Sequence, residues 1–204
     1  MTPKTNCRRV CRPLNIEGSF FLPVVLALLL ASCSHKRDET GTANAADSVH
    51  GTMVLKSSSF QGMSSIPSEY TCDGPDQSPD LEWSNLPPGT KSLAVICEDP
   101  DAPGGTFTHW VVYDIPATET GLPESVSNTP TLPDGARQGK NDFDKLGYGG
   151  PCPPSASKHR YFFRIYALDT LLDVPGGASR SRVQRSIESH KLGEGMLAGT
   201  YRRR

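Results

Sequence analysis

The sequence predicts a mostly β protein, an antiparallel β-sandwich with one small helix near its C-terminus. Two observations lead to this prediction. Runs of β-branched and aromatic residues recur between positions 52 and 202, and such residues suit a pleated, buried surface. Turns rich in Pro and Gly separate these runs, and many short strands with such turns are typical of sandwiches and barrels.

The first four strand signals follow one another closely. TMVLKSSSF, residues 52–60, predicts a first strand, and PDLEW, residues 79–83, contains a short second run. After a turn at LPPGT, residues 91–98 form a strong apolar strand signal. FTHWVVYDIP, residues 107–116, predicts the next strand because its β-branched and aromatic residues fit a buried sheet.

The longest strand signal, HRYFFRIYALD at residues 159–169, follows an irregular segment at 133–154 that is rich in Pro and Gly. So long a segment without regular structure is uncommon unless it is functional or cross-linked. Strand alternation assigns one face to His159, Tyr161, Phe163, Ile165 and Ala167. It assigns the other face to Arg160, Phe162, Arg164, Tyr166 and Leu168.

One helix is predicted, over residues 178–190. Ser179 or Ser181 is a possible N-cap, and the apolar Val183 and Ile187 stand four residues apart on one side of the helix. GEGMLAGTYR, residues 193–202, then predicts a closing strand. No internal repeat is present.

The N-terminal 50 residues differ from the rest of the chain. A basic start is followed by an apolar run at residues 20–33, too short to span a bilayer comfortably and typical of a secretory signal. Its end, LASC, resembles the lipobox of bacterial lipoproteins, which implies cleavage after residue 32 and a lipid on Cys33; in the alternative, an ordinary signal peptide, Cys33 is incidental. Residues 33–50 are polar and indicate a flexible tether, which leaves residues 51–204 as one domain.

Charge limits the classes of partner. Without residues 1–32 the chain keeps 17 basic and 21 acidic residues, a net charge near −4. Nucleic-acid-binding domains are usually basic, so the composition argues against a nucleic-acid partner.

The cysteines indicate one disulfide. Export would place the domain in an oxidising compartment, where Cys72, Cys97 and Cys152 would remain after processing. Cys97 lies in an apolar strand run and is predicted to be a buried thiol. Cys72 and Cys152 lie in segments whose Gly and Pro residues indicate loops, so we predict that they form a disulfide with each other. No zinc-binding spacing of Cys or His occurs, and no metal site is predicted.

Two polar clusters suggest a binding pocket. In CEDPDAPGGTFTHW, prolines stiffen the loop that follows a buried strand, so Asp99 and Asp101 should be held in place, and His109 should return close to Asp99 with its charged form favoured. In GYGGPCPP, residues 147–154, successive glycines can present backbone N–H groups to an anion. His159 and Tyr161 follow at a strand entrance.

If the two loops meet at one end of the sandwich, they enclose an acid, two histidines and a tyrosine between apolar walls. That mixture suits a small ligand with an anionic or polar headgroup. Each cluster by itself is also ordinary turn chemistry, since Asp, Gly and Pro are the usual turn residues.

Together, DPDAP, HWVVYDIP, GKNDFDKLGYGGPCPP and HRYFFRIYALD resemble the phosphatidylethanolamine-binding protein family, and more narrowly its bacterial, Raf-kinase-inhibitor-like branch. YTCDGPDQSPDLEW and GEGMLAGTYRR also fit that branch. The resemblance runs from about residue 53 to 203 and implies the family's β-sandwich with a small anion-accepting pocket near one edge.

The resemblance also implies which residues bind the ligand: Asp99, Asp101, Pro103, His109, Pro153, Pro154, His159 and Tyr161. One position departs from the branch, which usually has a glycine where this chain has Ala156. This departure puts the shape of the loop between Pro154 and His159 in doubt.

The leading functional hypothesis is a non-catalytic, lipid-anchored module of the bacterial envelope, on the periplasmic side, that binds a small anionic or phosphate-bearing ligand and regulates a protein partner. Ser34 is compatible with sorting to an outer membrane. One alternative is a hydrolase that uses Asp99, His109 and His159 as acids and bases. Against it, no nucleophile motif, metal cage or phosphate-binding loop is evident, and no cofactor is expected. A protein inhibitor of a hydrolase is a further alternative.

Overall fold

The computed structural model describes residues 51–154 and 157–203. The predicted signal peptide, Cys33 and the tether, and also Ala156, lie outside the described residues. The elements are β1 (Gly51–Thr52), β2 (Val54–Lys56), η1 (Ser68–Tyr70), β3 (Leu81–Ser84), β4 (Ser92–Asp99), β5 (Phe107–Pro116), β6 (Gly121–Leu122), β7 (Arg137–Gln138), β8 (Lys158–Leu168), α1 (Arg180–His190) and β9 (Lys191–Arg202).

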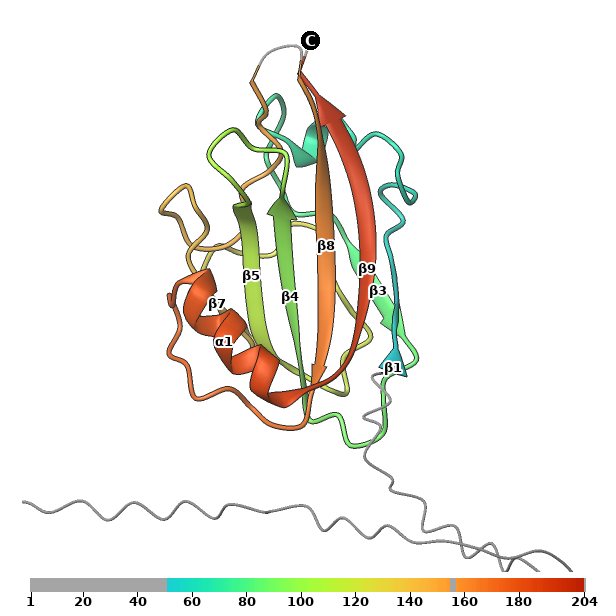
Figure 1. The fold of residues 1–204 in the computed structure, drawn as a ribbon, viewed down its shortest axis with the longest axis vertical. Helices are drawn as coiled ribbons and strands as arrows, with labels where there is room; N and C mark the ends of the chain where they lie inside the picture. Colours follow the sequence, from blue (N-terminus) through green and yellow to red (C-terminus); the bar gives the residue numbers. More distant parts are fainter. Residues whose placement is uncertain (1–50, 155–156, 204) are drawn as a thin grey trace, which may run out of the picture. The chain divides into compact units, whose positions relative to one another are not determined.

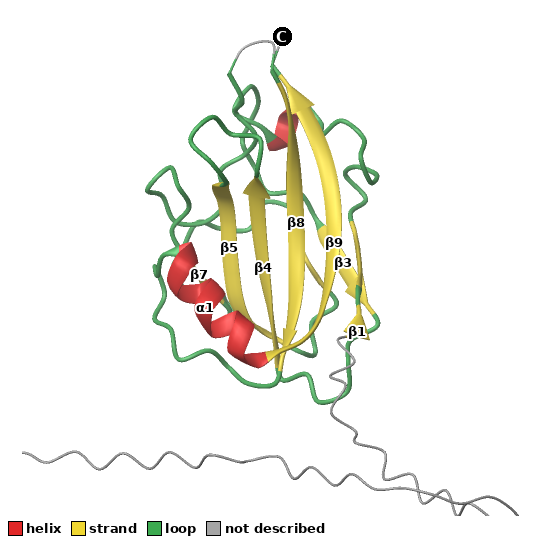
Figure 2. Ribbon diagram, in the orientation of Figure 1, coloured by secondary structure: helices red, strands yellow, loops and turns green. Residues whose placement is uncertain are grey.

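The strands form two sheets, as a sandwich requires. The larger sheet has the order β1-β9-β8-β4-β5-β7, and the smaller sheet has the order β2-β3-β6. In Figure 1 the long strands β5, β4, β8 and β9 stand side by side, with β3 behind them. The pairs are antiparallel except β1 with β9, which run parallel. The predicted mostly β, antiparallel fold with one α-helix in the described chain is confirmed (Figure 2).

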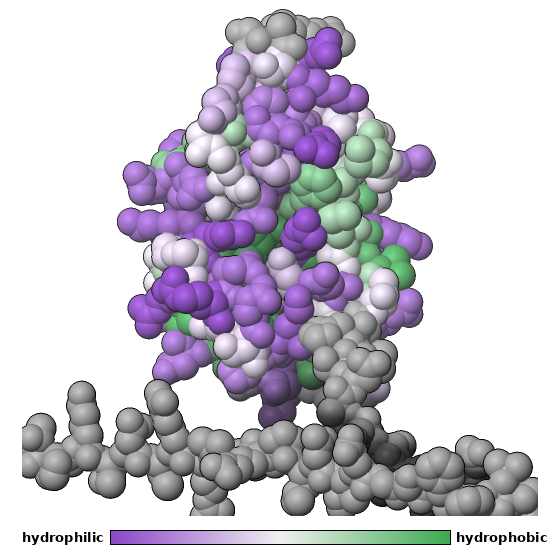
Figure 3. All heavy atoms as spheres, in the orientation of Figure 1, coloured by the Kyte–Doolittle hydropathy of each residue, from purple (hydrophilic) through white to green (hydrophobic). Residues whose placement is uncertain are grey.

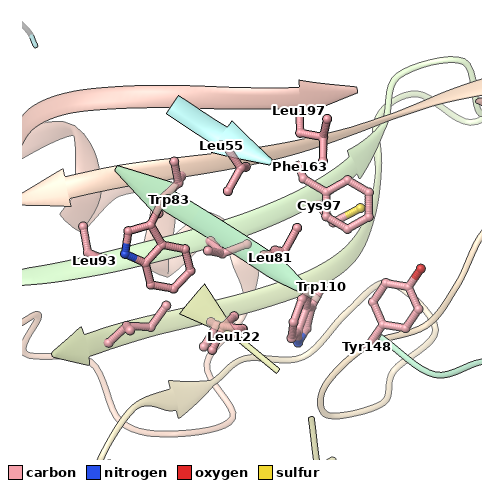
Figure 4. Packing of buried hydrophobic residues seen from close by; sticks show 14 of the residues in the cluster. Leu55, Leu81, Trp83, Leu93, Cys97, Trp110, Leu122, Tyr148, Phe163 and Leu197 are labelled. Atoms are coloured by element: carbon pink, nitrogen blue, oxygen red, sulfur yellow. The ribbon is translucent and has the colours of Figure 1, made fainter. Parts of the chain in front are cut away.

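The main core lies between the two sheets. Apolar side chains of the smaller sheet, among them Leu81 and Trp83, pack against Leu93, Trp110 and Phe163 of the larger sheet (Figure 4). All five are almost fully buried. The two faces of β8 that alternation separates are distinct in the structure, and the face of His159 through Ala167 is the one buried toward this core.

A second core lies between the outer face of the larger sheet and α1. Val183 and Ile187, which the sequence places on one side of the helix, are fully buried there against residues such as Ile96 and Tyr166. The helix covers only part of the outer face, where it contacts β5 and β8 (Figure 1). Among the described residues, no helix has the length and apolarity needed to cross a membrane.

Two local expectations need correction, and two short strands were not predicted. The run expected to form one strand over residues 52–60 instead contributes to β1 and β2, in different sheets, and ends at Lys56, because the backbone N–H groups of Ser58 and Ser59 donate to the Asp80 carboxylate. Ser179 holds the N-cap position of α1 but makes no side-chain capping bond; its hydroxyl lies 3.2 Å from that of Ser181. The two-residue strands β6 and β7 carry too few residues for a periodic signal.

Cysteine placement agrees with the sequence argument. Cys72 and Cys152 are joined by a disulfide that connects positions 80 residues apart. Cys97 is a buried free thiol in the main core. Burial raises the pKa of the Cys97 thiol well above its usual value, so it stays protonated and apolar in character.

Candidate functional site

A cavity of about 190 Å³ lies at one end of the larger sheet, where β4 ends and β8 begins. The loop that follows β4 and the glycine- and proline-rich segment before β8, which the sequence argument expected to meet, both border this cavity. The residues that line the cavity are Asp99, Ala102, Pro103, Phe107, His109, Phe143, Cys152, Pro153, Pro154 and His159. Six of the eight residues implied by the family resemblance therefore line one cavity.

Asp99 and His159 form the polar centre of the cavity. Asp99 is the last residue of β4, His159 is the second residue of β8, and both are almost fully buried. The Nδ1–H of His159 donates to Oδ2 of Asp99 at 2.7 Å, and Oδ1 accepts the backbone N–H of Asp101 at 2.8 Å. The carboxylate thus fixes the imidazole, and Nε2 is the ring nitrogen left for a ligand.

His109 is oriented differently from the expectation. Its Nδ1 lies 2.6 Å from the carbonyl oxygen of Gly149, which can only accept, so Nδ1 carries the proton. The histidine partner of Asp99 is therefore His159, not His109. Burial lowers the pKa of His109, although the Gly149 carbonyl and Asp99 act in the opposite direction. The neutral imidazole is favoured, whereas the sequence argument expected the charged form.

Two aromatic residues that the sequence argument did not select form a wall beside His109. The rings of Phe107 and Phe143 lie 5.2 and 5.5 Å from the His109 ring, centre to centre, and 4.7 Å from each other. The alternation of side chains along β5 could have identified Phe107, since it stands two residues before His109 and therefore lies on the same face of the strand. Phe143 lies in the 133–154 segment and has no such signal. Its ring fits because residue 149 is Gly, where a Cβ would lie 2.7 Å from the ring.

Asp101 and Tyr161 do not line the cavity. Asp101 accepts two bonds from the Arg160 guanidinium, at 2.8 and 2.6 Å, and one from the Arg160 backbone N–H. The Arg160 side chain lowers the pKa of Asp101 to about 2, so the carboxylate is charged and already paired. Alternation along β8 explains the separation, because His159 points inward and Arg160 outward.

Tyr161 lies behind His109, with the two rings 5.1 Å apart, and is fully buried. Its hydroxyl has no hydrogen-bond partner among the described residues. Burial raises the pKa of Tyr161 well above its usual range, so the hydroxyl stays protonated. The Asp99 carboxylate contributes to the raised pKa, so the Tyr161 hydroxyl lies near the polar centre of the site although Tyr161 is not among the lining residues.

Two backbone N–H groups of the glycine segment, which the sequence argument expected to face an anion, donate to other parts of the protein instead. Gly149 N–H donates to the His109 carbonyl oxygen at 2.9 Å, and Gly150 N–H donates to Oδ1 of Asp76 at 2.6 Å. These amides attach the segment to β5 and to the 70–76 loop. The disulfide at Cys152 is a further attachment, placed directly before the wall made by Pro153 and Pro154.

The site therefore offers two imidazole Nε2 atoms and one carboxylate between proline and phenylalanine walls. No Lys or Arg is among its lining residues. No group of three or more His, Cys, Asp or Glu in the described part of the chain is arranged to hold a metal ion.

The sequence profile of the family described as phosphatidylethanolamine-binding protein matches residues 56–202, and the chain belongs to this family. Among curated relatives, a UPF0098 protein of Methanothermobacter thermautotrophicus is 55% identical over 151 residues, which cover 74% of this chain and 99% of the relative. The UPF0098 protein YbhB of Escherichia coli is 42% identical over 132 residues, 63% of this chain and 84% of the relative.

Solved structures agree with the fold. Escherichia coli YbcL, described as a member of the mammalian PEBP family, superposes with a TM-score of 0.70 at 35% identity, over 74% of this chain and 99% of the chain in that structure. A phosphatidylethanolamine-binding protein homolog from Chlamydia trachomatis superposes with a TM-score of 0.68, also at 35% identity, over 75% of this chain and 99% of the chain in that structure. The Methanothermobacter relative, matched over 99% of its length, consists of this domain and little else.

Proposed function

We propose that the domain binds a small anionic or phosphate-bearing ligand in the cavity and does not transform it. The observation that supports this most is the shared orientation of two buried histidines. Both His109 and His159 commit Nδ1 to a protein oxygen, so both have only Nε2 for a guest. Two fixed nitrogens beside apolar walls are the sparse, convergent polar groups typical of a small-molecule site.

Among the described residues no Lys or Arg lines the cavity, so we assign the positive charge for an anion to the imidazoles. A protonated His159 would face Asp99 on one side and donate Nε2–H to the ligand on the other. His109 has a lowered pKa and gains its second proton only when the anion offsets the cost of burial. We therefore expect ligand affinity to rise as the pH falls from 8 to 6.

The size of the cavity favours a headgroup. About 190 Å³ is below the roughly 300–1,000 Å³ of pockets that enclose drug-sized ligands. A phosphate or phosphoethanolamine group suits this space, and acyl chains would have to stay outside. This makes the phosphate group, whether free or part of a lipid, the unit that is recognised.

The test is a titration of the domain with inorganic phosphate and with phosphoethanolamine, followed by the imidazole ¹H–¹⁵N signals of His109 and His159. Saturable shifts of both signals are expected, with at least tenfold weaker binding in Asp99→Ala and His159→Gln. Arg164→Gln, which removes a cation from the outer face of β8, is the control and should bind normally. Absence of any saturable shift at pH 6 would refute the proposal.

A hydrolase is the second candidate, and the Asp99–His159 bond favours it. A carboxylate-oriented imidazole can act as a general base on water. Among the described residues no Ser or Thr lines the cavity, and Cys152 is held in the disulfide, so this candidate uses water as the nucleophile. A panel of esters and phosphoesters distinguishes the two functions: turnover that His159→Gln abolishes would establish an enzyme.

As part of the same proposal, the chain belongs to the bacterial Raf-kinase-inhibitor-like branch and is anchored in the cell envelope through a lipid on Cys33. The support is the LASC sequence after a short apolar run. Cys33→Ala should release the protein from the membrane fraction, and an unchanged distribution would count against lipidation. Regulation of a protein partner would then take place at the envelope surface.

A further inference from the structure

A groove outside the proposed ligand site runs between α1 and the segment that follows β8. Its lining residues are Thr170, Leu171, Leu172, Asp173, Val174, Arg182, Arg185, Ser186, Ser189 and His190. Arg182 and Arg185 are one helical turn apart and exposed, and neither has a carboxylate within 4.0 Å in the described part of the chain. Arg180 on the same helix is paired with Glu98. Two guanidinium groups therefore face the groove with their donors available for oxyanions.

An exposed leucine stands at the edge of this groove. Leu171 is 62% exposed, while its neighbour Leu172 is buried in the second core. On the other side of the same segment lies a second groove, whose lining residues include Lys91 and Arg137 as well as Leu171 and Leu172. The second groove is not basic overall, because its lining also includes Asp114 and Asp134 and Arg137 is paired with Asp114 at 3.5 Å. In the first groove two arginines stand against one aspartate, Asp173, and hydrophilic residues cover the surface over α1 (Figure 3).

This surface lies at the end of the sheet where the chain enters the domain. Gly51 pairs with Gly193, and Leu168 pairs with Lys191, so β1, the end of β8 and the C-terminus of α1 are neighbours. Figure 1 shows β1 and the C-terminal end of α1 at the same end of the molecule. The ligand cavity is at the opposite end, where His159 pairs with Tyr201.

We propose that this surface docks onto an anionic phospholipid membrane, with Leu171 in the interfacial region and with Arg182 and Arg185 on lipid phosphates. Charge complementarity and the position of the chain entry both support a membrane as the occupant. The described chain begins at this end, so a lipid on Cys33, as in the proposed function, would attach to the domain from this side. The ligand cavity would then face away from the membrane.

The expected binding is modest. A Lys or Arg near an anionic surface strengthens binding by about fivefold per charge at physiological salt. Two arginines and one leucine give weak association for the free domain, and the interaction should weaken with salt. A tether to the same membrane would raise the effective concentration and make weak contacts sufficient to orient the domain.

The test uses residues 51–204, because relatives such as the Methanothermobacter protein consist of this domain alone. Trp83 and Trp110 are buried, so Leu171→Trp introduces a tryptophan that reports on the groove edge. Met196→Trp is the matched control, since Met196 is 49% exposed on β9, on a different part of the surface. Each variant is mixed with vesicles of phosphatidylglycerol and phosphatidylcholine (1:1) or of phosphatidylcholine alone.

The expected result is a blue shift of emission for Leu171→Trp with the anionic vesicles only. The shift should disappear at 0.5 M salt. It should also disappear when Arg182→Glu and Arg185→Glu are combined with Leu171→Trp in the same chain, and that variant should bind phosphate in the cavity as before. No shift with anionic vesicles, or an equal shift for Met196→Trp, would overturn the proposal. Binding of polyglutamate in place of vesicles would also overturn it, in favour of an acidic protein partner.

Discussion

The domain contains the same pair of side chains at both ends of β8, an aspartate that accepts from the Nδ1–H of a histidine. At the ligand end, Asp99 and His159 are 2.7 Å apart, and their side chains are 5% and 7% exposed. At the chain-entry end, Asp169 and His190 are 2.9 Å apart and are 52% and 42% exposed. The geometry is nearly equal, so the comparison isolates the effect of burial.

Burial changes what such a pair does. Water competes for the exposed pair and screens its charges, and exposed pairs contribute little to stability. In the buried pair water does not compete, the Asp99 carboxylate is held by both the His159 Nδ1–H and the Asp101 backbone N–H, and the imidazole has one orientation. A fixed Nε2 can serve a binding site, whereas a mobile one at the surface cannot do so as effectively.

The largest expected effect comes from breaking the buried pair. Asp99→Ala leaves the Nδ1–H of His159 and the backbone N–H of Asp101 without their acceptor. We expect the free energy of unfolding to fall by about 3 kcal/mol, as is usual when one member of a buried pair is removed. Asp169→Ala should cost less than about 1 kcal/mol. Urea unfolding followed by tryptophan fluorescence measures both; equal costs would show that burial does not separate the two pairs.

The next effect concerns the disulfide, which is found only at the ligand end among the described residues. Replacing both Cys72 and Cys152 by Ser should lower the free energy of unfolding by about 2–4 kcal/mol, because the bond closes a long loop in the unfolded chain. Phosphate affinity should fall as well, since Pro153 and Pro154 lose their covalent attachment. Cys97→Ala is the control for loss of a thiol; unchanged affinity in the double Ser variant would show that the wall is held without the bond.

Much of the fold could be predicted from the sequence, because its strongest signals are local. The alternation along β8 grouped its side chains by face and separated His159 from Arg160 correctly, although it did not say which face is buried. Val183 and Ile187 gave the buried side of α1 for the same reason. The two-residue strands and the parallel pairing of β1 depend on contacts with distant segments, which a single-sequence pattern does not contain.

Six of the eight residues that the resemblance implied line one cavity, but the connections among them were not predicted. β4 pairs with both β5, which carries His109, and β8, which carries His159, so only the folded geometry selects His159 as the partner of Asp99. Likewise, the amides of Gly149 and Gly150 are used by the His109 carbonyl and by Asp76, neither of which could be chosen in advance. Residue type predicts which groups can interact, and the fold decides which do.

A smaller effect is expected in the pH dependence of stability, which involves His109 at the ligand end. Burial lowers the pKa of His109 from its ordinary value of 6.5, so the folded state binds fewer protons than the unfolded state as the pH falls below that value. The stability linked to His109 is thus present above pH 6.5 and is lost on acidification. The urea concentration at the midpoint of unfolding should fall from pH 7.5 to 6.5 to 5.5. In His109→Gln it should fall less. Saturating phosphate should oppose this decline, because the anion favours the protonated imidazole; a steeper decline with phosphate would contradict this linkage.

The smallest effect is expected at Asp101, which lies two residues from Asp99 but faces solvent. Its partner Arg160 is 51% exposed, so removing the charge should cost less than about 1 kcal/mol even though the bond is bidentate. In Asp101→Asn the amide oxygen can still accept the Arg160 backbone N–H, and phosphate affinity should stay within about twofold of the unmodified domain. Because the pKa of Asp101 is about 2, the difference in stability should persist through neutral and mildly acidic pH and disappear only as the pH approaches that value. A tenfold loss of affinity in this variant would place Asp101 in the binding site after all and would make the two carboxylates of the loop equivalent.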